Sequence, residues 1–261
     1  MLDSLSPQRR RLVLGIGGLV LALLTAVVVF AVVRSRSSTR PVAQTIPGPV
    51  LLVPGYGGRV ASLQPLVSAL RSTGRTAVVV EPVGDGAGDL EIQADHLAEV
   101  AQSVLKQTAA PSVDVVGYSA GGVVARLWIR DAGGKAPVRR VLTLGSPQHG
   151  TSQAALGLEF AGSCSVACEQ LVPDSDLLRH LNAGDETPDG QLWATVRSNS
   201  DRVVTPVDSA ALAGAVNIVV QDICPGSTVP HGDLPANPVV LAALDSVLGA
   251  GPPQAPTGVS C

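Results

Sequence analysis

The sequence predicts an α/β fold with a mostly parallel central sheet, helices on both faces of that sheet, and one N-terminal transmembrane helix before it. From residue 50 onward, short apolar runs that suit strands alternate with longer segments whose apolar residues recur at helical spacing. That alternation is typical of parallel sheets. The runs are continuously apolar, which indicates strands covered by helices on both faces.

The N-terminal segment 12–33 is apolar almost throughout. A helix of that length would span roughly 30 Å of hydrocarbon. A cleavable signal peptide has a shorter apolar region, of about 7–15 residues, and small residues at its cleavage site, whereas here Arg34 follows directly. We therefore expect an uncleaved anchor, with secretion after signal cleavage as the alternative. Residues 1–11 would form a short cytoplasmic N-terminus, and 34–47 a linker to a catalytic domain over 48–261.

The order of elements in this domain follows from the apolar pattern. Six strands are expected, at Val50–Val53, Thr76–Val80, Val113–Val116, Val138–Leu144, Leu192–Val196 and Ala215–Val220. Helices are expected at Arg59–Arg71, Leu90–Leu105 and Gly122–Arg130, and after Asn237, which can cap a closing helix. The stretch Thr151–Asp189 breaks the alternation and indicates an insertion over the top of the sheet.

Charge and cysteine content restrict the function and the location of the chain. A formal net charge of -3 argues against nucleic acid as a partner. The four cysteines, an even number, fit two disulfides in an oxidising compartment, although four cysteines allow three pairings. Basic residues flank the apolar segment on both sides, so they do not decide its orientation. The cysteines favour a domain outside the cytoplasm, and we therefore expect a protein of the cell membrane with an extracellular domain. We also expect a monomer.

The strongest motif is Gly117-Tyr118-Ser119-Ala120-Gly121, which follows an expected strand and precedes an expected helix. That context is required for a nucleophile elbow, a tight strand-to-helix turn that exposes a serine. A side chain at Gly117 or Gly121 would clash with the neighbouring backbone. Ser119 would lie at the helix N-terminus, where the helix dipole favours developing negative charge.

A serine nucleophile needs a base and a carboxylate that orients the base. In this architecture the chain order is serine, acid, histidine. Asp201 follows the fifth expected strand and His231 follows the last one, so both should lie on the same rim as Ser119. Asp208 and Asp222 remain alternatives for the acid.

The other three histidines fit the role of base less well. His96 and His180 lie within expected helices, and His149 precedes the acid in the chain and is expected to shape the pocket wall.

An oxyanion hole needs two backbone N–H donors, and removing one typically costs about 2.7–4 kcal/mol of transition-state stabilisation. We assign these donors to Ala120, after the nucleophile, and to Tyr56, in the glycine-rich loop after the first strand.

The segments VLLVPGYGG, DVVGYSAGGVVARLWIR, VLTLGSPQHGT and SNSDRVVTP, with the late His231, resemble the small bacterial triacylglycerol lipases and esterases of the α/β-hydrolase superfamily. The resemblance implies Ser119 as nucleophile, Asp201 as acid and His231 as base, with no metal or other cofactor. Pro54 replaces the histidine usual in the first loop of that family. By the same resemblance, two disulfides are implied, Cys164–Cys168 and Cys224–Cys261.

The sequence therefore predicts a serine ester hydrolase, a lipase or esterase that acts on a small-molecule or lipid ester. An acyltransferase or a thioesterase would use the same triad, so these activities remain alternatives. A non-catalytic, membrane-tethered scaffold is a further alternative, which the order of Ser119, Asp201 and His231 disfavours. The sequence leaves the length of the acyl chain open.

Overall fold

The computed structural model describes Gln8, Thr25 and residues 42–155 and 164–261. The chain divides into two units, residues 1–40 and 41–261, and the fold is that of the second unit. None of the described helices is long and apolar enough to cross a membrane. The membrane segment expected over 12–33 lies outside the described residues, apart from Thr25.

The last residues of the expected linker make contacts with the domain. The compact unit begins at residue 41, within the range 34–47 assigned to the linker. The backbone oxygen of Gln44 accepts hydrogen bonds from Arg139 and Arg140, at 2.6 and 3.1 Å. Residues from Gln44 onward are therefore bonded to the domain, an interaction that composition alone does not reveal.

The centre of the domain is a six-stranded sheet in the order β2-β1-β3-β4-β5-β6, and all its strand pairs are parallel. Each strand lies within about two residues of its expected position. The strands are β1 (Val50–Val53), β2 (Ala77–Val79), β3 (Val113–Tyr118), β4 (Val138–Leu144), β5 (Leu192–Arg197) and β6 (Val216–Val219).

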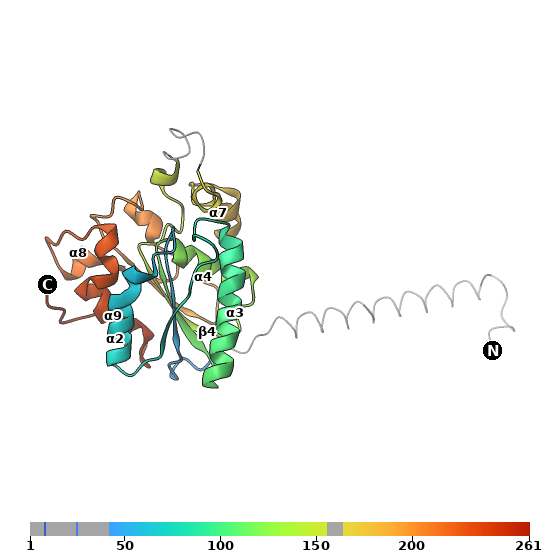
Figure 1. Cartoon of the computed structure of the whole chain (residues 1–261), viewed down its shortest axis with the longest axis horizontal. Coiled ribbons are helices and arrows are strands. Elements are labelled where there is room, and N and C mark those ends of the chain that lie inside the picture. Colours follow the sequence, from blue (N-terminus) through green and yellow to red (C-terminus); the bar gives the residue numbers. More distant parts are fainter. Residues whose placement is uncertain (1–7, 9–24, 26–41, 156–163) are drawn as a thin grey trace. The chain divides into compact units, whose positions relative to one another are not determined.

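Helices cover both faces of the sheet (Figure 1). On one face pack α3 (Leu90–Thr108) and α4 (Ala120–Asp131), and on the other pack α2 (Gln64–Ser72) and α9 (Pro238–Leu248). Alternate residues of a strand serve the two faces, since Leu51 and Val53 pack with α3 and α4 while Val50 and Leu52 pack with α2 and α9. The domain therefore has one apolar core on each face of the sheet. Because both faces of each strand are buried, the strands are apolar at successive residues.

The helix expected at Arg59–Arg71 is divided into two pieces. A 3-10 turn, η2 (Val60–Leu63), precedes α2, which has Pro65 in its first turn. Proline has no N–H and restricts the residue before it, so it suits a helix start rather than an interior. In the described part of the region 151–191, residues 152–155 are helical, and two short helices follow, α6 (Val166–Gln170) and α7 (Asp176–Leu181). The remaining short elements are η3 (Val207–Ala210), α8 (Val220–Ile223) and η4 (His231–Ala236).

The strand order places a switch point between β1 and β3. The connection after β1 leads to β2 on one side of it, whereas the connection after β3 leads to β4 on the other. In open parallel sheets, ligands bind outside the carboxyl ends of the strands at such a point. The loop after β1 and the turn after β3 therefore mark the expected location of the site.

A buried cluster of charged groups lies near the amino ends of β3 and β4. Asp114 binds Arg139 through two hydrogen bonds, at 2.9 and 2.5 Å, and Arg75 through one at 2.6 Å. Arg139 and Arg140 also donate to backbone oxygens at the end of α9, those of Leu248 and Val247, at 2.5 Å each. The guanidinium groups thus neutralise both a carboxylate and the negative end of a helix dipole.

We predict that Asp114→Asn destabilises the domain by about 3–5 kcal/mol, because it leaves Arg139 buried without an anionic partner. Urea unfolding of the full chain measures this change. The matched control is Asp176→Asn, which breaks an exposed ion pair with Arg179 and should leave the free energy of unfolding nearly unchanged. Equal effects of the two substitutions would contradict the structural importance of the cluster.

Candidate active site

The turn between β3 and α4 carries Ser119 in a strained backbone conformation. Its φ is 54° and its ψ is -127°, and it occupies the N-cap position of α4. A non-glycine residue with positive φ is uncommon, and such strain gathers at functional sites. The turn thus has the shape of a nucleophile elbow, and it presents Ser119 at the carboxyl edge of the sheet.

Two glycines permit this turn, as the motif predicts. A Cβ atom at Gly121 would lie 2.3 Å from the backbone oxygen of Val53, at the end of β1. A Cβ atom at Gly117 would lie 2.5 Å from the Cα atom of Gly122, in the first turn of α4. Neither approach leaves room for a side chain, so the close packing of β1, β3 and α4 requires glycine at both positions.

The residues expected as acid and base come from two separate loops. Asp201 follows β5 and His231 follows β6, and the Nδ1 atom of His231 lies 2.6 Å from Oδ2 of Asp201. Both residues are buried. The other carboxylate oxygen of Asp201 accepts the N–H groups of Val203 and Val204, at 2.8 and 2.9 Å. These bonds fix the carboxylate, and the carboxylate holds Nδ1 of His231. The Nε2 atom of His231 has no partner among the described residues.

Tyr118 contacts the expected base and precedes the expected nucleophile. The ring of Tyr118 stacks against the imidazole of His231, with ring centroids 5.2 Å apart and planes at 29°. Because Tyr118 immediately precedes Ser119, this stack places His231 beside the strained turn. The structure therefore gathers Ser119, Asp201 and His231 into one site at the carboxyl edge of the sheet.

The loop after β1 lies directly against the nucleophile. A Cβ atom at Gly55 would lie 2.8 Å from Cβ of Ser119 and 3.4 Å from its Oγ. In the part of the chain that the structure describes, the N–H groups of Tyr56 and Ala120 have no backbone or side-chain acceptor. Both are therefore free to bind a negatively charged oxygen. Pro54 introduces no obstacle to this arrangement, because the expected donor is the backbone of Tyr56.

The side chain of Tyr56 points to a different part of the domain. Its hydroxyl lies 3.0 Å from Oγ of Ser165, the residue that caps α6. Half of the Tyr56 side chain remains exposed.

The disulfide Cys164–Cys168 encloses Ser165, and a second disulfide, Cys224–Cys261, ties the C-terminal end of the chain to the end of α8. The pairings that the family resemblance implies are therefore both present.

The remaining candidates for acid and base lie in other interactions. His96 is on α3 and has Glu99 3.7 Å away, and His180 is on α7 and lies 3.3 Å from Asp131. Asp208 binds Arg197 at 2.9 Å. Asp222 lies on α8, the short helix that follows β6. None of these residues is paired with His231.

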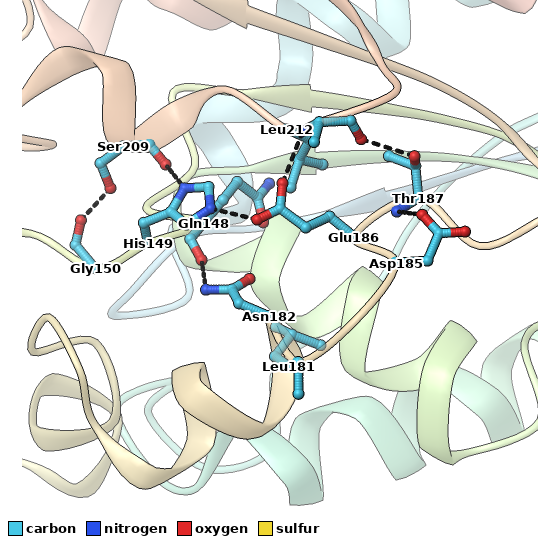
Figure 2. Close-up of polar contacts among 12 residues, drawn as sticks. Gln148, His149, Gly150, Leu181, Asn182, Asp185, Glu186, Thr187, Ser209 and Leu212 are labelled. Atoms are coloured by element: carbon cyan, nitrogen blue, oxygen red, sulfur yellow. Dashed lines mark hydrogen bonds and ion pairs between the residues drawn. The ribbon is translucent and has the colours of Figure 1, made fainter.

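His149 forms a second histidine–carboxylate pair, shown in Figure 2. Its Nε2 atom lies 2.6 Å from Glu186, and its Nδ1 atom lies 3.2 Å from the backbone oxygen of Ser209. Burial by itself would raise the pKa of Glu186, but the N–H of Ala213 and the contact with His149 outweigh it and lower that pKa. The pair joins the loops after β4, α7 and β5. His149 thus holds loops together, where the sequence indicated a pocket wall.

Two hollows adjoin the site. A crevice of about 20 Å³ is lined by residues of the loop after β1 and of the turn after β3, and by apolar side chains of α3 and α4. Its lining includes Gly55, Ala120, Val124 and Leu90. A more open groove of about 630 Å³ runs beside Asp201 and His231. Within the described ranges, no group of three or more His, Cys, Asp or Glu side chains could hold a metal ion.

Comparison with known proteins agrees with this geometry. The fold is similar to that of lipase B from Aspergillus fumigatus, with a TM-score of 0.69 and 22% identity over 79% of this chain and 54% of that one. It is also similar to the mature lipase BlEst2 from Bacillus licheniformis, with a TM-score of 0.65 and 16% identity over 78% of this chain and 92% of that one. The chain thus spans about half the length of the Aspergillus lipase.

Sequence comparison identifies a family as well as a fold. No curated protein matches the chain. The model of the family described as palmitoyl protein thioesterase matches residues 49–183, slightly more than half of the 261 residues. The matched range includes the loop after β1 and the turn at Ser119. The chain therefore belongs to the palmitoyl protein thioesterase family.

Proposed function

We propose that the chain is a serine hydrolase that cleaves carboxylic esters of lipids or small molecules through an acyl-enzyme on Ser119. The observation that carries this proposal is the buried hydrogen bond of 2.6 Å between His231 and Asp201, beside a serine held at a φ of 54°. A histidine bound to a carboxylate through Nδ1 has its Nε2 available as a general base. Membership of a thioesterase family supports the same chemistry of acyl transfer to serine.

In the proposed reaction, Nε2 of His231 takes the proton of Ser119 as Oγ forms a bond to the ester carbonyl carbon. Asp201 orients the imidazole and stabilises its charged form. The imidazolium then gives its proton to the departing alcohol as the ester C–O bond breaks. Water, deprotonated by His231, attacks the acyl-enzyme, and the proton returns to Ser119 as the carboxylic acid leaves.

The negative charge that develops on the carbonyl oxygen needs stabilisation during both steps. The free N–H groups of Tyr56 and Ala120 flank the nucleophile and would supply it. The dipole of α4, whose N-terminus is at Ser119, adds to the same effect. No side chain is required for this part of the mechanism.

We predict that the full chain hydrolyses p-nitrophenyl esters and that Ser119→Ala abolishes this activity, because no other group in the proposed mechanism can form the acyl-enzyme. A short and a long ester are compared because the acyl chain could occupy either the small crevice at Gly55 and Ala120 or the larger groove beside Asp201 and His231. Initial rates with p-nitrophenyl butyrate and palmitate provide both measurements.

Asp176→Asn is the matched control, because Asp176 lies on the exposed face of α7 and should not affect the rate. Activity that survives in Ser119→Ala would contradict the proposed nucleophile. An inactive wild type that also fails to react with a fluorophosphonate would favour a non-catalytic scaffold. Transfer of the acyl group to added alcohol in preference to water would favour an acyltransferase.

Thioester hydrolysis is a second candidate activity, favoured by the family match over residues 49–183. The same triad would attack a thioester, and the leaving thiolate needs less protonation than an alkoxide. For a thioesterase we expect a higher kcat/KM with an acyl thioester than with the oxygen ester of the same acyl group. Release of thiol and of alcohol from a matched pair of butyryl substrates measures the ratio, and a ratio below one would identify an esterase.

We propose further that residues 12–33 anchor the chain in the cell membrane, with the catalytic unit outside the cytoplasm. The apolar length of that segment and the two disulfides support this location. In cells that express the full chain, we expect the protein to stay in the membrane pellet after alkaline carbonate extraction and to be digested by protease added to intact cells. A shortened chain in the medium would instead indicate a cleaved signal peptide.

A further inference from the structure

Tyr118 connects the turn that carries Ser119 with the loop that carries His231. It is the last residue of β3 and is covalently joined to Ser119, yet its side chain packs in the core formed by α2, α9 and the sheet. Only 9% of its surface is exposed. The residue between the first glycine and the serine of the motif is not required by the chemistry of the turn, so its identity needs another explanation.

The side chain of Tyr118 touches His231 at two points. Its hydroxyl donates a hydrogen bond of 3.2 Å to the backbone oxygen of His231, and its ring stacks on the imidazole. Burial, followed by the negative charges of Asp201 and Asp233, raises the pKa of Tyr118 to about 12. The hydroxyl therefore remains protonated, and remains a donor, throughout the pH range in which a serine hydrolase works.

These contacts complement the one that Asp201 makes. The bond from Asp201 fixes a single atom of the imidazole, Nδ1, and by itself leaves the ring free to tilt about that bond. The stack with Tyr118 fixes the plane of the ring, and the hydroxyl fixes the backbone from which the ring extends. His231 lies at the beginning of η4, after a loop that contains no regular element between Cys224 and Pro230. The backbone there needs such support.

We propose that Tyr118 is a positioning residue that holds the imidazole of His231 in register with the Oγ atom of Ser119. The proposal rests on the catalytic roles assigned above. Because Tyr118 and Ser119 are adjacent in β3 and its turn, any shift of the nucleophile moves the support of the base with it. The aromatic face also lies against a ring that becomes positively charged during the reaction, an interaction that is stronger with imidazolium than with neutral imidazole.

Two substitutions separate the hydroxyl from the ring. In Tyr118→Phe the stack is kept and the hydrogen bond is lost, for which we expect kcat to fall by about tenfold with KM unchanged. In Tyr118→Leu both contacts are lost, and we expect kcat to fall by about 10²-fold, since small displacements of a catalytic group have effects of that size. Steady-state kinetics of the full chain with p-nitrophenyl butyrate measures both.

Leu70→Ala is the matched control for a merely structural role. Leu70 is buried in the same core, on α2, and its backbone oxygen accepts the N–H of Arg75, whose side chain binds Asp114 near the amino end of β3. We expect it to lower the melting temperature at least as much as Tyr118→Phe does, while kcat stays within about twofold of the wild type. A fall in kcat that followed melting temperature alone across the three variants would overturn the proposal.

A spectroscopic measurement tests the proposal without any substrate. The proton of the short bond between His231 and Asp201 should give a low-field NMR resonance, assigned by its loss in His231→Gln. We expect this resonance to shift in Tyr118→Phe, to broaden or vanish in Tyr118→Leu, and to persist in Leu70→Ala. An unchanged resonance in Tyr118→Leu would overturn the positioning role. If the wild type is inactive, the proposed function fails, and this resonance alone decides the role of Tyr118.

Discussion

The chemistry proposed for this domain depends on close contact between backbone segments at the carboxyl ends of β1 and β3. At Gly121 a single added carbon would come within 2.3 Å of the oxygen of Val53, and at Gly55 it would come within 2.8 Å of the side chain of Ser119. Ser119 has a positive φ at this contact, and the N–H groups of Tyr56 and Ala120 have no acceptor among the described residues. The strain is stabilised by the packing of α4 against both strands.

The strand β3 connects the charged cluster at the amino edge of the sheet with the candidate site at its carboxyl edge. Near its beginning, Asp114 binds buried guanidinium groups that also satisfy the carbonyl groups at the end of α9. At its end, Tyr118 supports His231 and the next residue is Ser119. The central strand is thus anchored by charge at one edge and carries the reactive group at the other. Since α9 follows the loop of His231, its anchoring also limits the movement of the base.

The parts of the fold set by local patterns could be predicted from the sequence, because continuous apolar runs and the Gly-x-Ser-x-Gly spacing are local signals. All six strands lie near their expected positions, and Asp201 and His231 meet as their order in the chain suggests. Contacts between distant residues could not be predicted. Tyr118 and His231 are 113 residues apart, and nothing near His149 indicates Glu186 as its partner. One signal was available for the charged cluster, since Asp114 and Arg139 lie inside apolar strands and buried charges require partners.

The use of backbone donors at the oxyanion position has a consequence for the evolution of this domain. Substitution by any residue except proline changes the side chain and keeps the backbone N–H, so the proposed oxyanion donors would persist through most substitutions. The side chain of Tyr56, which is half exposed and bonded to Ser165, can therefore be replaced without removing the proposed N–H donor. Substrate preference can diversify at this loop at little risk to the rate of the chemical step.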